Sequence, residues 1–185
     1  MLNILMTIQE EFAVKRPIDD ELIRKIADGD MDAFHTLYES ASASVYGYAL
    51  SLTKNSHNAD DVLQETFLKV HANAPAYRSQ GKPMAWILTI AKNIALSKLR
   101  EQSRVQAIEE THAVDLSSIE KAEQRMLIET LLKHLSEEER QIVMLHAISG
   151  LKHREIACLL ELPLGTVLSK YKRAIQKLQI LTEEV

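Results

Sequence analysis

Glycine and proline, which most often interrupt regular secondary structure, are scarce in this chain and lie mostly between stretches of helical periodicity. The 185 residues include only 5 glycines and 4 prolines. A β-sandwich or β-barrel needs frequent turns, which so few of these residues cannot supply. Hydrophobic residues make up 46% of the chain, which is enough for a sizeable core. The sequence therefore predicts an all-α protein.

Four helices are expected in the first half of the chain, where apolar residues recur at helical spacing. Asp30 is placed to cap the long second helix, and Ser56 or Asn58 to cap the third. Pro83 suits the first position of the fourth helix, because its missing N–H costs nothing there. These helices predict one small bundle.

A second helical unit is expected after a polar, acidic stretch. Ser136 is a candidate cap with Glu139 at the capping-box position. The predicted helices of this unit cover residues 121–134, 137–148, 152–161 and about 164–180. The resulting division is an N-terminal extension (1–18), a four-helix domain (19–104), a linker (105–120) and a second helical domain (121–185).

The last two helices have the pattern of a helix-turn-helix. One turn lies at Ser149-Gly150, and the break at Leu162-Pro163 precedes a basic helix. Four apolar residues of that helix are expected to face inward: Val167, Tyr171, Ala174 and Leu178. The other side then carries hydroxyls and cations suited to phosphates and base edges, namely Thr166, Ser169, Lys170, Arg173 and Lys177, with Lys172 beside them. The alternative is an ordinary solvated basic helix.

Charge is distributed in blocks that the formal net charge of −4 conceals. Residues 19–65 contain ten acidic and three basic residues, whereas residues 66–104 contain seven basic residues and one acidic residue. Residues 105–120 hold four acids and no base, and residues 164–180 hold four bases and no acid. Two basic blocks therefore remain candidates for nucleic-acid contact in a chain that is acidic on average.

Two segments resemble a known family. The final basic helix, with its GTV opening, resembles domain 4 of bacterial RNA polymerase sigma factors of the compact extracytoplasmic-function type. NADDVLQETFLKV and GKPMAWILTIAKNIALSKLR resemble domain 2 of the same family. The two resemblances occur in the family's order, with a linker of suitable size between them. The resemblance implies a sigma factor that binds core polymerase, directs it to minus-10 and minus-35 promoter elements and promotes DNA melting.

The resemblance also implies roles for individual residues. Asp61, Gln64 and Glu65 are expected to face core polymerase. Tyr77, Trp86, Thr89, Lys92 and Asn93 are expected at the minus-10 element, where a loop over residues 76–82 accepts a flipped base. Trp86 could equally be a core residue, and the carboxylates could belong to a plain solvated face. Thr166, Ser169, Lys170, Lys172 and Arg173 are expected at the minus-35 element.

Two departures from the family pattern and the role of the linker bear on this interpretation. Leu168 stands where the family often has a basic residue, and Lys152 stands where it often has a Ser or Thr cap. Both changes predict weaker minus-35 binding, unless another group replaces the missing cap. The acidic linker could enter the RNA channel of the polymerase or could be a solvated tether.

The expected partners are core RNA polymerase and promoter DNA, with an anti-sigma factor as a further candidate. No membrane insertion, cofactor or metal is expected, and we predict a cytoplasmic monomer. An enzyme is the first alternative, but the catalytic motifs sought are absent, and Cys158 is interpreted as a buried small hydrophobe. The second alternative is a stand-alone DNA-binding regulator, which should bind duplex DNA as a dimer without polymerase.

Overall fold

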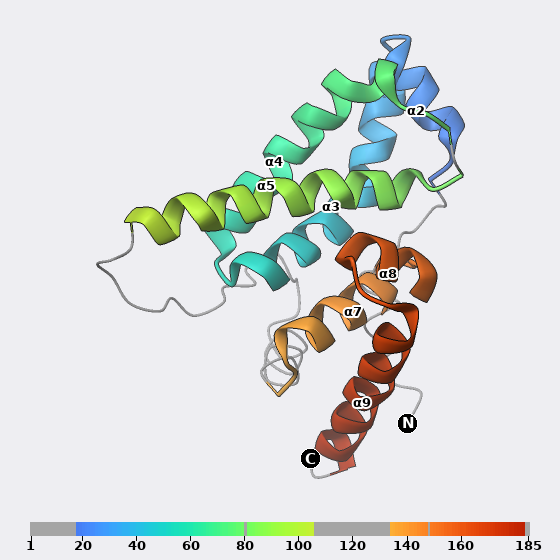
Figure 1. Ribbon diagram of the computed structural model, residues 1–185. Helices are drawn as coiled ribbons and strands as arrows, with labels where there is room; N and C mark the ends of the chain where they lie inside the picture. Colours follow the sequence, from blue (N-terminus) through green and yellow to red (C-terminus); the bar gives the residue numbers. More distant parts are fainter. Residues whose placement is uncertain (1–17, 80, 106–133, 148, 184–185) are drawn as a thin grey trace.

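The computed structural model describes residues 18–79, 81–105, 134–147 and 149–183, and within these ranges the regular structure is helical (Figure 1). The elements in chain order are α2 (Asp20–Ala27), α3 (Met31–Thr53), α4 (Ser56–Asn73), the short 3-10 helix η1 (Ala74–Ala76), α5 (Pro83–Val105), α7 (Glu137–Ala147), α8 (His153–Leu160) and α9 (Leu164–Glu183). The all-α prediction is confirmed. The predictions for residues 1–17, for all but the first residue of the linker at 105–120 and for all but the last residue of the helix over 121–134 lie outside the described residues.

Two of the three predicted caps are confirmed. The Asp30 carboxylate accepts hydrogen bonds from the backbone N–H groups of Asp32 and Ala33, both at 2.9 Å, and so begins α3. At α7 the Glu139 carboxylate accepts from the Ser136 N–H at 3.0 Å, and the Ser136 hydroxyl accepts from the Glu139 N–H at 3.4 Å. Each cap satisfies N–H groups that have no partner inside the helix.

The predicted cap of α4 was wrong. Asn55, and neither Ser56 nor Asn58, precedes the helix, and its side-chain oxygen accepts from the Asn58 N–H at 2.9 Å. The physical reason lies in the preceding turn. Lys54 ends α3 in the left-handed conformation, with φ of 54°, so the chain reverses within one residue and Asn55 occupies the cap position.

The second half of α3 is buried on all of its sides. Every residue from 44 to 53 is buried, although the sequence predicted a single inward stripe. Helices α4 and α5 cover one side, and α7 covers another, so the two helical units pack directly against each other (Figure 1). Ile142, Leu145 and Ile156 of the second unit belong to the same hydrophobic cluster as the α3 core. The bundle and part of the second helical unit thus share one hydrophobic cluster, while Leu135, Val143, Ala174 and Leu178 form a separate one.

One buried hydroxyl in this core is unsatisfied. The Tyr48 side chain is 1% exposed, and its hydroxyl has no hydrogen-bond partner among the described residues. Burial raises the pKa of this phenol. Removing an unpaired buried polar group stabilises a fold by about 1 kcal/mol. Tyr48→Phe is therefore expected to raise the unfolding midpoint in a thermal melt by a few degrees. Tyr38→Phe, the same change at an exposed ring, should leave the midpoint unchanged, and a lower midpoint for Tyr48→Phe would contradict the assignment.

Helix α9 packs on α7 and α8 through the stripe that the sequence predicted. Val167, Ala174 and Leu178 are at most 5% exposed, and Tyr171 is half-buried. The Tyr171 ring meets His146 and His153 edge to face, with centroids 4.9 and 4.7 Å away, and the two imidazoles stack at 4.4 Å. An aromatic cluster therefore holds the start of α8 against α9.

This cluster predicts a pH dependence of stability. Burial and the neighbouring His146 lower the pKa of His153 below its ordinary value of 6.5, and its Nε2 atom is buried without a partner among the described residues. A depressed folded-state pKa means that the unfolded chain takes up a proton first as the pH falls. Stability is therefore expected to decline below about pH 6.5. Denaturant unfolding of the wild type and of His153→Gln at pH 7.5 and 5.5 checks this, since the variant should show the smaller loss.

Candidate functional site

Helix α4 presents an acidic face next to α5. The side chains of Asp61 and Glu65 are 43% and 40% exposed, and Gln64 is exposed beside them. Lys98 of α5 lies 3.5 Å from the Asp61 carboxylate and 3.9 Å from that of Glu65, and Lys69 lies 3.0 Å from Glu65. The three predicted polymerase-facing residues thus share one surface, where two lysines hold the carboxylates in place.

The five residues predicted at the minus-10 element line a single cavity of about 520 Å³. They are Tyr77, Trp86, Thr89, Lys92 and Asn93, and they come from the loop after η1 and from one side of α5. The rings of Tyr77 and Trp86 lie 4.7 Å apart at a tilt of 51°. Trp86 is partly buried against the core and also lines the cavity, so it takes part in both of the roles considered for it.

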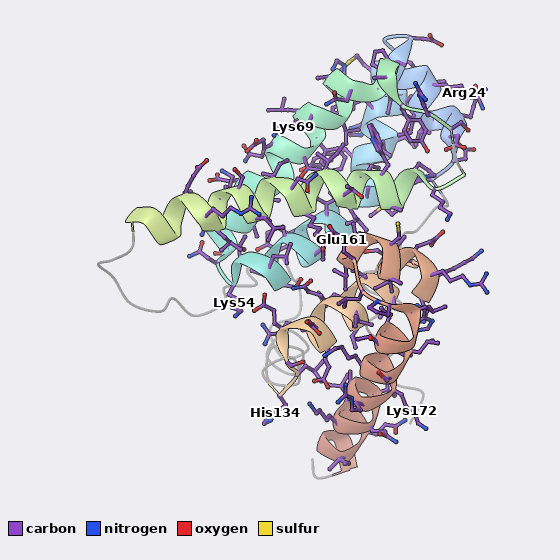
Figure 2. All side chains as sticks on the ribbon, viewed as in Figure 1. Arg24, Lys54, Lys69, His134, Glu161 and Lys172 are labelled. Carbon is purple, nitrogen blue, oxygen red and sulfur yellow. The ribbon has the colours of Figure 1, made fainter. Side chains whose placement is uncertain are left out.

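The opposite wall of this cavity belongs to the second helical unit. It is formed by Glu155, Cys158, Leu159 and Glu161, at and just after α8. The ammonium of Lys92 donates to the Leu159 carbonyl at 2.7 Å and to the Glu161 carboxylate at 2.9 Å. Figure 2 labels Glu161 where α8 meets α5. The hydrogen bond and charge of Lys92 lower the pKa of Glu161, although Glu161 is itself well exposed.

Cys158 is exposed, so the prediction that it is buried was wrong. Ile156, Ala157 and Leu159 are the buried residues of this short helix. At 100° per residue, Cys158 lies about 130° from the direction halfway between Ile156 and Leu159, and so it points away from the core. Its side of α8 is the one that faces the cavity.

The basic face of α9 divides into two groups of cations. Lys172 and Arg173 are exposed, and Figure 2 shows Lys172 on the side of α9 away from α7. Lys170 instead lies 2.6 Å from Glu138, and Lys177 lies 2.7 Å from Glu139. Both partners belong to the first turn of α7, so these two lysines hold α9 onto α7.

The hydroxyls predicted on the same face lie at the start of α9. Ser169 is exposed, with its hydroxyl donating to the Thr166 carbonyl at 2.9 Å, and Thr166 is half-buried. The structure thus keeps Ser169, Lys172 and Arg173 at the surface of α9.

Both departures from the family pattern persist in the structure. At α8 the Glu155 carboxylate accepts from the Lys152 N–H at 2.9 Å, but no side chain of the cap residue accepts from the first N–H groups of the helix, as a Ser or Thr would. The side chain of Leu168 is 47% exposed on α9 and replaces a cation with an apolar group. Both departures therefore still predict weaker minus-35 binding.

Two residues that line or support the cavity were missed in the sequence. Glu161 was missed because nothing in the chain order indicates that α8 packs beside α5. Asp20 was not singled out in the sequence, yet its carboxylate accepts hydrogen bonds from Tyr77, Ser79 and Gly81. Nothing in the chain order indicates that α2 packs beside the loop that follows η1.

The part of the chain that the structure describes contains neither a candidate membrane span nor a candidate metal cluster. None of its helices is both long and apolar enough to span a bilayer. Nor do its His, Cys, Asp and Glu side chains form a group of three or more that could hold a metal ion.

Comparison with known proteins identifies the family. The model of sigma-70 region 2 matches residues 37–105, and that of sigma-70 region 4 matches residues 125–178. The ECF RNA polymerase sigma factor SigK of Mycobacterium ulcerans (strain Agy99) is 30% identical over 169 residues, which cover 85% of this chain and 90% of that protein. The chain belongs to the sigma-70 family, as a sigma factor of the ECF type. α4 and α5 thus lie in region 2, and α7, α8 and α9 in region 4.

Other sigma factors share this sequence pattern and fold. SigK of Mycobacterium tuberculosis (strain CDC 1551 / Oshkosh) is 27% identical over 170 residues, 86% of this chain and 91% of that protein. The structure of CnrH in complex with the cytosolic domain of CnrY matches with a TM-score of 0.64 at 23% identity, over 90% of this chain and 97% of that one. RpoE in complex with the anti-sigma factor NepR from Bartonella quintana matches with a TM-score of 0.66 at 24% identity, over 81% and 96%. These two likenesses concern the fold.

Proposed function

We propose that this sigma factor binds core RNA polymerase through Asp61, Gln64 and Glu65 and reads promoters with two separate surfaces. The cavity-lining side of α5 contacts the minus-10 element and assists melting, and the exposed residues of α9 contact the minus-35 element. The observation that carries the proposal is the cavity, which gathers an aromatic pair, a cation and an amide. Aromatic stacking and hydrogen bonding are what a flipped base needs to offset the loss of its pairing.

In this proposal the chain contributes binding and positioning, and the polymerase contributes the chemistry. The acidic face of α4 complements a basic partner surface and fixes its register. Ser169, Lys172 and Arg173 contact phosphates and base edges in the major groove, as the exposed face of a recognition helix does. In this role the chain has no catalytic residues and acts as a monomer in the cytoplasm, where polymerase and chromosome lie. An anti-sigma factor could bind it and control its activity.

The two promoter-reading surfaces cannot both be used while the helical units are packed together. Lys92 is engaged by Leu159 and Glu161, and α8 forms the far wall of the cavity that Asn93 lines. DNA at the minus-10 face would occupy the same space as α8. The proposed function therefore requires α8 to separate from α5 when the polymerase binds.

The test is transcription by purified components. Core RNA polymerase, with and without the full chain, is given sheared genomic DNA of the source organism, and the 5′ ends of the transcripts are sequenced. We expect new start sites that share two upstream sequence elements, a minus-10 element and a minus-35 element, one for each proposed surface. Transcripts without shared elements would overturn the proposal. Tight dimeric binding to duplex promoter DNA without polymerase would instead support a stand-alone regulator.

Arg173→Ala is expected to weaken use of the minus-35 element. Arg173 is exposed on the α9 face proposed to enter the groove, and loss of one such contact lowers affinity by about tenfold. Run-off transcription from a promoter found above measures the loss. On a template whose minus-35 element is scrambled, wild type and variant should be equally weak, and an equal loss on both templates would show that Arg173 does not act through this element.

A further inference from the structure

Asp20 lies far from the family's DNA-facing residues in the sequence, yet it holds the loop that carries Tyr77. We propose that Asp20 is a positioning residue, which fixes this loop in the shape that receives an unpaired promoter base. The inference rests on the proposed function, since it treats this loop as part of the surface that reads the minus-10 element. It adds a residue from α2 to a site otherwise built from α5 and the loop before it.

Three donors from the loop converge on the Asp20 carboxylate. The Tyr77 hydroxyl donates to Oδ1 at 2.5 Å, the Ser79 hydroxyl donates to Oδ2, and the Gly81 N–H donates to Oδ2 at 2.9 Å. The donors stand 57, 59 and 61 residues later in the chain. The bonds from Ser79 and Tyr77 also lower the pKa of Asp20 below its ordinary range, as hydrogen bonds to a carboxylate do.

The needs of α2 itself do not account for these contacts. Asp19 is the cap of α2, and its carboxylate accepts from the Leu22 N–H at 2.9 Å. Asp20 is the first helical residue, where an acid is ordinarily favoured by the helix dipole alone. Instead, both of its carboxylate oxygens accept hydrogen bonds from donors in the loop. The two neighbouring carboxylates therefore have different roles. Asp19 caps the helix, and Asp20 binds the loop to the first turn of the helix.

The hydrogen bonds of Asp20 position an aromatic ring of the proposed reading site. The Tyr77 hydroxyl is fixed by Asp20, while its ring lies 4.7 Å from Trp86 and lines the cavity with Lys92 and Asn93. Gly81 supports the same geometry with φ of 67°, a conformation that other residues rarely adopt. A loop held in advance avoids an ordering cost when the base enters. Asp20 thereby favours capture of the flipped base without touching DNA.

The experiment compares open-complex formation on intact and base-deleted promoters. Core polymerase with the full chain is given a promoter from the transcription test, and then a series in which one abasic site moves through the minus-10 element. Permanganate reactivity measures melting. The position at which the wild type loses most melting marks the flipped base, and the ratio of melting with and without that base is the base-recognition ratio.

Four variants define the role of Asp20. Asp20→Ala is expected to lower the base-recognition ratio by about tenfold or more, the usual effect of losing a hydrogen bond to a charged group. Tyr77→Phe keeps the ring and removes the hydroxyl, so it should lower the ratio in the same direction. The double variant should be little worse than Asp20→Ala, because the two changes remove the same bond. Asp19→Ala loses the same charge one residue away and should keep the wild-type ratio, even though it weakens the helix.

The outcomes separate failure of this inference from failure of the proposed function. A wild-type ratio for Asp20→Ala, alongside a reduced ratio for Tyr77→Ala, would overturn the inference and leave the reading site intact. Equal losses in Asp19→Ala and Asp20→Ala would also overturn it, because the effect would then come from α2 stability. A wild type that is insensitive to every abasic position would overturn the reading site itself. If Asp20→Ala fails to fold, two milder variants replace it in the test. They are Tyr77→Phe and Asp20→Asn, which keeps one acceptor oxygen, and wild-type ratios for both would overturn the inference.

Discussion

Asp61→Arg is expected to reduce binding of this sigma factor to core polymerase by at least about tenfold, since reversing a charge within a complementary interface replaces an attraction by a repulsion. Asp61 shares the acidic face of α4 with Gln64 and Glu65, and Lys98 lies 3.5 Å from its carboxylate. An arginine there places two cations side by side and removes the acid that the basic partner would meet. Co-purification with tagged core polymerase, titrated with the variant, measures the affinity.

The matched control for this prediction is Glu39→Arg, the same charge reversal at an exposed residue of α3. Glu39 pairs with His35 on its own helix at 3.3 Å and lies outside the proposed polymerase-facing surface. It should retain wild-type affinity. Equal losses in the two variants would point to net charge as the cause, and full retention by Asp61→Arg would refute the assignment of the α4 face.

Asn93→Ala is expected to reduce open-complex formation by about tenfold or more, because a side-chain amide that reads a base edge contributes roughly 1–3 kcal/mol of discrimination. Asn93 is exposed on α5 and lines the cavity together with Lys92 and Trp86. Its loss should leave polymerase affinity intact, since it lies away from the Asp61 surface. Permanganate footprinting of the melted region, at saturating sigma factor, isolates this step.

The same substitution at Asn73 controls for the chemistry of removing an amide. Asn73 is an exposed residue at the end of α4, and its side-chain amide donates to the Lys69 carbonyl at 2.8 Å. Asn73→Ala should melt promoters at the wild-type rate. Normal melting by Asn93→Ala would exclude Asn93 from the minus-10 contact, and reduced polymerase binding by that variant would mean that the α5 side also faces the polymerase.

Local sequence signals were sufficient for most helices because caps and apolar spacing act over a few residues. Asp30, Ser136 and Pro83 each begin a helix as predicted. The cap at Asn55 was missed because it depends on the left-handed turn at Lys54, which the sequence pattern did not reveal. The Lys54 N–H donates to the Leu50 carbonyl at 2.9 Å and its ammonium lies 3.4 Å from the Glu137 carboxylate of α7, a contact that local propensity does not indicate.

The packing of the two helical units could not be predicted from periodicity, although one signal was present. Residues 40–53 contain no charged side chain, and their apolar and small residues occupy every side of α3. A helix with that composition is buried all round, so it needs a cover on the side away from its own bundle. The sequence reveals the need for a cover, but it does not reveal that α7 supplies it.

The candidate site was predicted one residue at a time, and its arrangement depends on contacts between segments that are distant in the chain. Helical spacing places Trp86, Thr89, Lys92 and Asn93 near one another on α5, whereas Tyr77, in the loop before α5, was added to the group by the family resemblance. The engagement of Lys170 and Lys177 with α7 was missed, since a cation on a helix surface has the same pattern whether it meets DNA or a neighbouring carboxylate. The charge pattern indicates that these lysines can bind an anion, but only the fold shows that carboxylates of α7 already occupy them.

The hydrophobic cluster shared by α3 and α7 has a thermal consequence for promoter use. Separating the two units exposes apolar surface that includes parts of Ile142 and Leu145, so the opening proposed for this sigma factor increases the heat capacity. Burial of apolar surface stabilises the closed arrangement less as the temperature falls. The fraction of molecules in which the two units are separated therefore changes with temperature. The apparent affinity for polymerase is proportional to that fraction, so it changes too. Assembly on the polymerase is expected to show a curved temperature dependence, beyond that of the DNA contacts.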